Sequence, residues 1–168
     1  SMTAQGESAA SQSLSAAKFR EAARYYKQQN ALYYLFSKCN INGANILKKY
    51  PNLYGEGYFD PSCIDDIQDL KLLRDYLKSN AMNDFGVLCQ WARCEVSNKK
   101  QLEVFSAAPV LPSFSNPPTE KEKLLTEVAE IVAAAQYDAI AKMAAIKAKT
   151  SSKPVSVHLT LLGQGVFN

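Results

Sequence analysis

Val155-Ser-Val-His-Leu-Thr-Leu-Leu162, followed directly by Gly163-Gln-Gly-Val-Phe-Asn168, is the segment from which the fold class follows. Its first part is rich in apolar residues and predicts a strand. The two glycines after it can take positive φ and let backbone amides approach a diphosphate closely. Because ligands of open α/β sheets bind beyond the carboxyl ends of strands, this loop is the predicted ligand site. A tight turn that binds nothing is the alternative interpretation of the G-x-G pattern.

The residues before this strand carry the clearest helix signal in the sequence. Thr119 and Glu122 supply a capping box after a proline-rich connection at 109–118, and we predict a helix from there to about Lys149. Its apolar positions are Leu125, Val128, Val132, Ala135, Ala139 and Met143. A helix that leads into a strand is typical of α/β layers. We therefore predict a single α/β domain over 1–168.

Two further helices are predicted from apolar residues at helical spacing. The first runs from about Ser13 to Cys39. The second follows an S-x-x-D start signal at 62–65, carries apolar residues on one face from Ile64 onward, and ends near Ser79.

Loops and two strands fill the remainder of the chain. Residues 1–12 predict a loop or the start of a helix, and residues 40–61 predict a loop rich in tyrosine and glycine. Alternating residues predict one strand over 85–91 and a second over 102–108. We expect these two strands to pair as neighbours.

The composition is that of an ordinary folded domain. Hydrophobic residues make up 47% and charged residues 21%, which disfavours a disordered or fibrous chain. A net charge of only +3, without a basic stripe, argues against a nucleic-acid partner. The sequence shows neither an apolar run of membrane-spanning length nor a signal-peptide pattern. We therefore expect a cytoplasmic protein with no membrane partner.

The cysteines do not predict a metal site. The four cysteines, at 39, 63, 89 and 94, form no CxxC pair, and the only histidine, His158, is distant in sequence. Zinc ligands at the usual spacings are therefore missing, and we expect free, buried thiols. The sequence also has no G-x-S-x-G elbow and no P-loop, which disfavours a serine hydrolase or a nucleoside triphosphatase.

Residues 157–168, Val-His-Leu-Thr-Leu-Leu-Gly-Gln-Gly-Val-Phe-Asn, resemble the strand and diphosphate loop of macrodomains, which bind ADP-ribose. Ala134-Ala-Gln-Tyr-Asp-Ala139 and Phe105-Ser-Ala-Ala-Pro-Val110 are similar to elements that precede this loop in a divergent macrodomain branch, the MavL-type ADP-ribosyl-arginine hydrolases. Gln5-Gly6, with the small residues after it, resembles a T-Q-G-P stretch of the same branch. The resemblance implies a macrodomain-like α/β fold, in which a mixed sheet is flanked by helices.

The resemblance also implies a function. The expected partner is ADP-ribose or an ADP-ribosylated protein, and the expected reaction removes ADP-ribose from a side chain, possibly arginine, without a cofactor. The implied ligand-binding residues are Gln5, Gly6, Ser106, Ala107, Ala108, Gly163, Gln164, Gly165, Val166, Phe167 and Asn168. Glu7 is the candidate catalytic carboxylate, which would activate water or deprotonate a ribose hydroxyl. A helix N-terminal acid is the alternative for Glu7. A bacterial effector, a type that this branch includes, would act in the host cytosol.

Some positions depart from the pattern of that branch. Gln164 stands where a second glycine is usual, and no acidic residue directly follows Trp91 or shortly precedes Gln5. These departures favour a second hypothesis, a catalytically inactive ADP-ribose reader. A third hypothesis is a protein-interaction domain that uses the tyrosine-rich segment 50–59. Because the pattern begins and stops within elements of a macrodomain, we also expect a fragment that is incomplete at both ends.

Several other polar or aromatic residues are candidate site residues: Glu56, Asp60, Glu95, Trp91, Asp138 and His158. Asp60 precedes a proline and is interpreted as a turn residue, and Glu95 as a solvated charge at a strand end. His158, inside the predicted strand, is interpreted as a hydrogen-bonded core group. Trp91 is interpreted as a core residue in preference to an adenine-stacking one, and Asp138 as a surface or supporting charge.

Overall fold

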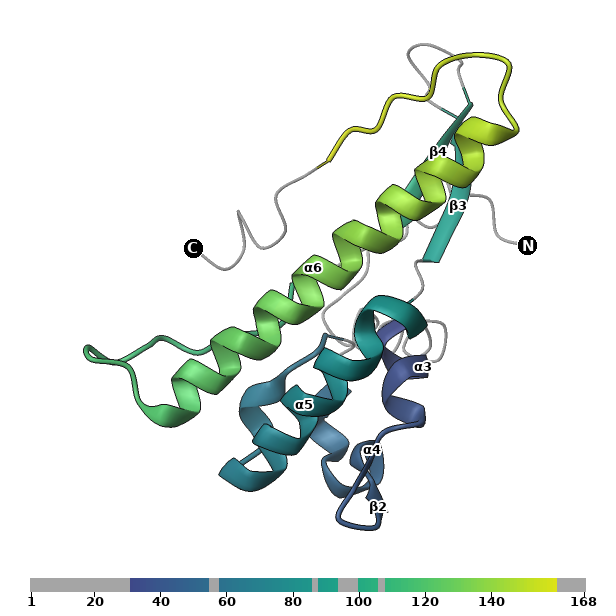
Figure 1. The fold of residues 1–168 in the computed structure, drawn as a ribbon. Helices are drawn as coiled ribbons and strands as arrows, with labels where there is room; N and C mark the ends of the chain where they lie inside the picture. The colour runs from purple at the N-terminus through teal and green to yellow at the C-terminus, as the bar shows by residue number, and fades with distance from the viewer. Residues whose placement is uncertain (1–30, 55–57, 86–87, 94–99, 106–107, 160–168) are drawn as a thin grey trace, which may run out of the picture.

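The computed structural model of the chain describes residues 31–54, 58–85, 88–93, 100–105 and 108–159 (Figure 1). Within these residues the chain is mixed α/β. It contains two long helices, several short helical turns and two small antiparallel sheets of two strands each. The predicted α/β class is confirmed in this general sense.

Helices α5 (Ile67–Asp84) and α6 (Glu120–Lys149) pack against each other and form the centre of the fold (Figure 1). The short helix α3 (Ala31–Ser37) adds two fully buried residues, Leu35 and Phe36. The buried faces of the two long helices are Leu70, Leu73, Leu77 and Ala81 of α5, and Leu124, Leu125, Val128, Val132 and Ala135 of α6. We call these residues, with the others packed around them, the helical core. The apolar spacing predicted for α6 is confirmed, because every predicted position is buried except Met143, which is half-buried.

Helix α6 begins where the capping box predicts. The Thr119 hydroxyl accepts a hydrogen bond from the Glu122 N–H at 3.2 Å, and the Glu122 carboxylate accepts one from the Thr119 N–H at 2.6 Å. The helix ends at Lys149, and Lys147 and Lys149 lie in its last turn, where positive charge is favourable to the helix dipole. The connection at 109–118 contains neither helix nor strand, as predicted.

Helix α5 begins later than predicted. Its N-cap is Asp66, whose carboxylate accepts hydrogen bonds from the N–H groups of Gln68 at 2.8 Å and Asp69 at 3.3 Å. Ser62 instead lies in the 3-10 helix η3 (Pro61–Cys63), and its N–H and hydroxyl both donate to Asp60. The S-x-x-D prediction was wrong because two other residues are the N-caps: Asp60 caps the short helix η3, and Asp66 caps the long helix α5.

The other end of α5 lies beyond the predicted end near Ser79. The Asn80 side chain donates to the Tyr76 carbonyl at 2.8 Å, so its amide supports the helix instead of ending it. Ala81 is buried in the helical core, and the Phe85 N–H closes the last turn on the Ala81 carbonyl at 3.0 Å. The burial of Ala81 therefore favours continuation of the helix beyond the polar residues Ser79 and Asn80.

Residues 40–54 hold short regular elements where a loop was predicted. They are β1 (Asn40–Ile41), β2 (Ala44–Asn45), α4 (Ile46–Lys49) and the 3-10 helix η2 (Pro51–Tyr54). Asn42 and Gly43 connect β1 to β2 and both have positive φ, as a two-residue hairpin turn requires. The segment buries Ile46, Leu53 and Tyr54. Elements of two to four residues are too short to show a hydrophobic period, which explains the missed prediction.

Strands β3 (Leu88–Arg93) and β4 (Lys100–Phe105) form an antiparallel hairpin. The pairing confirms the prediction that these two segments are neighbours. Their boundaries differ from 85–91 and 102–108, in part because Phe85 is the C-cap of α5. Figure 1 shows the hairpin on the side of the molecule where α6 ends.

Residues 155–159 are not a strand, which corrects the sequence prediction. They adopt no regular secondary structure, and all of them are exposed. A strand needs a partner for its N–H and C=O groups, and none of the described strands pairs with this segment. His158 is consequently an exposed residue and not a core group. The rest of the predicted strand, 160–162, lies outside the described residues.

Candidate functional site

Most residues of the predicted ADP-ribose site lie outside the part of the chain that the structure describes. They are Gln5, Gly6, Glu7, Ser106, Ala107, Gly163, Gln164, Gly165, Val166, Phe167 and Asn168. Ala108 is described, and it is half-buried in the connection that follows β4. Two residues further on, the Val110 N–H donates to the Phe59 carbonyl at 2.8 Å, which attaches this connection to the helical core. No two of the predicted site residues can therefore be placed together.

Two of the other candidates, Asp60 and Asp138, have structural roles. Asp60 is a turn residue, as interpreted, because its carboxylate caps η3 through the Ser62 N–H at 3.0 Å. Asp138 is a surface charge that forms an ion pair with Lys142 at 2.6 Å. Trp91 lies in β3, but its side chain is outside the described part of the structure. Glu56 and Glu95 also lie outside it.

The described residues contain one buried carboxylate, Asp69 in the first turn of α5. Its side chain is 0% exposed, and Lys49 forms an ion pair with Oδ2. The Tyr50 hydroxyl donates to Oδ2 at 2.5 Å, and Asn42 Nδ2 donates to Oδ1 at 2.9 Å. These three donors come from the β1–β2 turn and from the end of α4. Asp69 therefore fastens both of these elements to α5.

The contacts of Asp69 determine its charge. Burial raises the pKa of Asp69, but hydrogen bonds from Lys49, Tyr50 and Asn42, with the charge of Lys49, outweigh it and leave the pKa below the ordinary value. Burial, with Asp69 as hydrogen-bond acceptor, raises the pKa of Tyr50, so its hydroxyl keeps the proton that it donates. Both oxygens of Asp69 are engaged. We interpret this carboxylate as a structural anchor and not as a general base, which needs reach to a substrate proton.

The Asp69 cluster was not identified from the sequence, although one signal was available. Asp69 lies four residues before Leu73 and next to Leu70, on the apolar face of α5. A carboxylate at such a position predicts a buried charge with a partner. The partners could not be named, because Asn42 and Tyr50 lie 27 and 19 residues away in sequence.

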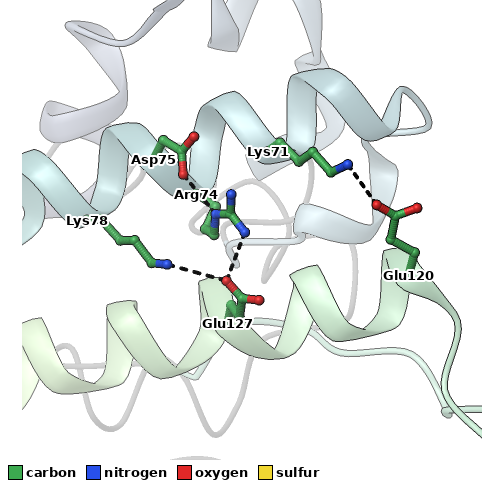
Figure 2. Close-up of polar contacts among 6 residues, drawn as sticks. All are labelled: Lys71, Arg74, Asp75, Lys78, Glu120 and Glu127. Atoms are coloured by element: carbon green, nitrogen blue, oxygen red, sulfur yellow. Dashed lines mark hydrogen bonds and ion pairs between the residues drawn. The ribbon is translucent and has the colours of Figure 1, made fainter.

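Ion pairs border the contact between α5 and α6, as Figure 2 shows. Lys71 pairs with Glu120 at 2.7 Å, while Arg74 and Lys78 both pair with Glu127, at 3.0 and 3.5 Å. These hydrogen bonds and charges lower the pKa of Glu120 and of Glu127. The side chains are partly exposed, so they add orientation to the helix pair more than stability.

The described cysteines are free thiols of low reactivity. Cys39 is buried and Cys63 half-buried, and neither forms a disulfide. Burial raises the pKa of Cys39 to about 12. Burial together with Asp60 and Asp65 raises the pKa of Cys63 to about 11. Because the thiolate is the nucleophile, neither residue is a candidate nucleophile. The side chains of Cys89 and Cys94 lie outside the described structure.

Two searches of the described residues found nothing further. Across the described ranges, no three His, Cys, Asp or Glu side chains are grouped so that they could hold a metal ion. None of the helices resolved in these ranges combines the length and the apolar character that crossing a membrane requires.

We compared the chain with known proteins in three ways. No protein-family model, no curated protein and no solved structure matches it. The resemblance of residues 157–168 to a macrodomain loop therefore stays a prediction from the sequence.

Proposed function

We propose that the chain binds ADP-ribose through residues 163–168 and removes ADP-ribose from a modified protein side chain, with arginine as the first linkage to test. The observation that carries the proposal is the order of segments along the chain. A long capped helix leads through an apolar segment into Gly163-Gln-Gly-Val-Phe-Asn168. Glycines in such a loop leave successive backbone amides free to bind phosphate oxygens.

Each part of the proposed site has a chemical role. The amides of residues 163–165 donate to the diphosphate, Phe167 covers the distal ribose, and residues 106–108 line the neighbouring strand end. Gln5-Gly6 brings Glu7 to the reacting ribose. Glu7 takes a proton from water as the water oxygen bonds to the anomeric carbon. The bond from that carbon to the guanidine nitrogen breaks, and the nitrogen takes up the proton that Glu7 received from water, which restores the carboxylate.

Two described features support this arrangement, and one qualifies it. The Val110–Phe59 hydrogen bond holds the connection after β4 against the helical core, and the capping box fixes where α6 begins. In the described conformation, however, the apolar segment 155–159 is exposed and pairs with none of the described strands. The proposed site therefore requires this segment to pair.

Calorimetric titration with ADP-ribose tests the binding step. We expect the unchanged chain to bind and Gly165→Glu to lose binding, because the new side chain places a negative charge and extra atoms where the diphosphate would lie. Ser113→Glu is the matched control, since it adds the same charge to an exposed position in the proline-rich connection. Absence of binding by the unchanged chain, or equal binding by both variants, contradicts the proposal.

Turnover separates a hydrolase from a reader. We expect the chain to release ADP-ribose from a peptide mono-ADP-ribosylated on arginine, followed by mass spectrometry, and Glu7→Gln to bind the same peptide without releasing it. Binding without release by the unchanged chain would identify a reader. Release by Glu7→Gln at the unchanged rate would remove Glu7 from the mechanism.

The tyrosine-rich segment 50–59 gives little support to a protein-interaction domain. Tyr54 and Phe59 are buried, and their rings pack against Phe36 with centroids 5.9 and 4.9 Å away. Tyr50 is held by Asp69, and of the described aromatic residues in this segment only Tyr58 is exposed, at 37%. These residues are chiefly part of the core.

A further inference from the structure

The β3–β4 hairpin has no third strand among the described residues. A two-stranded hairpin alone is only marginally stable in water. No described strand pairs with the outer edge of β4, and an edge of this kind is a template for another strand. The described side chains of the hairpin also do not belong to the helical core. Within the described part of the chain, the hairpin can therefore take both an edge partner and a covering layer.

The register of the hairpin assigns its residues to two faces. Residues directly opposite each other in an antiparallel pair lie on the same face. The first face holds the apolar pairs Cys89–Val104 and Trp91–Leu102, with the basic pair Arg93–Lys100 at the turn end. The second face holds the more polar pairs Gln90–Glu103 and Ala92–Gln101, with the apolar pair Leu88–Phe105 at the open end. A layer of apolar side chains is expected over the first of these faces.

Residues 155–159 have the pattern of a strand that lacks its partner. Val155, Val157 and Leu159 alternate with Ser156 and His158, which puts the three apolar side chains on one face of an extended chain. Their side chains are 37%, 48% and 62% exposed. Three neighbouring exposed apolar residues with period two indicate a surface that becomes buried by pairing.

The last third of α6 supplies apolar side chains that the helical core does not use. Ala139 and Ile140 are buried but lie outside the helical core cluster, and Ile146 is 66% exposed. Met143 is half-buried between them. This part of α6 ends on the side of the molecule where the hairpin lies (Figure 1).

The connectivity fixes how the segment can join the hairpin. Strand β4 leads into α6, and α6 leads through 150–154 into Val155, a connection of the usual length. A strand, a helix and a second strand in this order place the second strand parallel to the first by a right-handed crossover. We propose that Val155–Leu159 is a strap that closes onto the β4 edge as a third, parallel strand, with the last third of α6 over the first face of the hairpin. This closure needs no ligand and does not depend on the proposed function.

Hydrogen exchange of the ligand-free chain tests the closure directly. We expect alternate amides of 155–159, and the amides of β4 that do not pair with β3, to be protected on the order of tenfold or more over unstructured rates. Exchange of 155–159 at unstructured rates, with α5 and α6 protected, would overturn the proposal. If the protected amides are instead those of β3 that do not pair with β4, the assignment of the strap to the β4 edge is wrong.

A pair of lysine substitutions tests the packing of the strap. Val157→Lys places a charge on its apolar face, whereas Ser156→Lys adds the same side chain to its polar face. Trp91 is the only tryptophan of the chain, so its fluorescence reports on the hairpin. We expect Val157→Lys alone to shift the emission to longer wavelength and to raise exchange at β4. A change in both variants, or in neither, contradicts the proposal, and far-UV circular dichroism confirms that both keep their helices. If Val157→Lys does not fold, exchange in the unchanged chain decides.

Discussion

Apolar side chains are buried in the helical core but exposed in part of the hairpin region, which we define as the β3–β4 hairpin and residues 155–159. In the helical core, Leu70, Leu73 and Leu77 of α5 are fully buried against α6. In the hairpin region, Val157 and Leu159 are exposed, and the hairpin has no third strand among the described residues. Helix α6 takes part in both, since Leu125 is 1% and Ile146 is 66% exposed.

The difference arises because helices and strands find the partners for their backbone hydrogen bonds at different distances along the chain. A helix satisfies its own backbone groups, so α5 and α6 need only bury one face each. A strand satisfies its backbone only through another strand, so an apolar segment without a partner remains exposed. The core is therefore complete within the described chain, and the sheet is not.

Truncation of a core leucine gives the largest expected effect. Leu125→Ala should lower the free energy of unfolding by about 3 kcal/mol, through lost burial and the cavity left between α5 and α6. Leu72→Ala, at a 41% exposed position of α5, should cost much less. Urea denaturation followed by far-UV circular dichroism measures both. Equal losses would mean that α6 and α5 do not share a core.

Removal of the Asp69 charge comes next. Asp69→Asn should cost about 2 kcal/mol, because Lys49 loses its ion pair and the cluster keeps only neutral hydrogen bonds. Asp75→Asn is the matched control, since Asp75 is 60% exposed and pairs with Arg74 on the surface. Urea denaturation at neutral pH compares the two. A loss no greater than that of Asp75→Asn would show that the anchor contributes little.

The same residue predicts a dependence on pH. The pKa of Asp69 in the folded chain lies below its ordinary value of 3.8, so its contribution to stability is fully present above that pH. It is lost as the pH falls through the lower, folded-state pKa. The stability of the unchanged chain should therefore fall more steeply below pH 3.8 than that of Asp69→Asn. Parallel unfolding curves for the two would contradict the assignment.

The start of α6 provides a smaller effect. Thr119→Ala should cost about 1 kcal/mol, because the Glu122 N–H loses its acceptor. Hydrogen bonds from Ser115 and Thr119 lower the pKa of Glu122 to about 2, so the box is intact at neutral pH. Thr126→Ala, inside the helix, is the control and should be near neutral, since alanine favours the helix. Thermal unfolding ranks the two variants.

The ion pairs at the edge of the α5–α6 contact should have the smallest effect. Glu127→Gln removes the partner of Arg74 and Lys78 (Figure 2) and should lower the unfolding midpoint slightly at low salt. The difference should vanish at about 1 M sodium chloride, where surface charges are screened. Glu130→Gln is the control, because Glu130 is exposed on α6 and forms no ion pair with the described residues. A difference that persists at high salt would point to packing instead of charge.

Local signals predicted the parts of the fold that depend on neighbours in sequence. The capping box of Thr119 and Glu122 gave the start of α6, and the pairing of β3 with β4 followed from two alternating segments close together. The S-x-x-D signal failed at Ser62 because Asp60 accepted its hydrogen bonds. None of these signals could reveal the partners of Asp69, because the fold brings them to it from distant parts of the chain.

The candidate ADP-ribose site shows the same limit. Residues 163–168 are candidates because glycines permit an anion-binding loop, which is a property of the residues themselves. Only the resemblance links Glu7 and residues 106–108 to this loop, because carboxylates and strand ends from distant segments meet only after folding. That part of the site stays a prediction for the binding and turnover experiments.

The sequence by itself determined the two long helices, their apolar faces and the capping of α6, since each depends on residues a few positions apart. Only the tertiary structure decided which partners would hold the Asp69 charge, that Tyr54 and Phe59 would be buried, and that Val155–Leu159 would lie exposed in the described conformation. These outcomes depend on which surfaces meet. A chain can bury a charge or form a strand only where folding brings a partner to it.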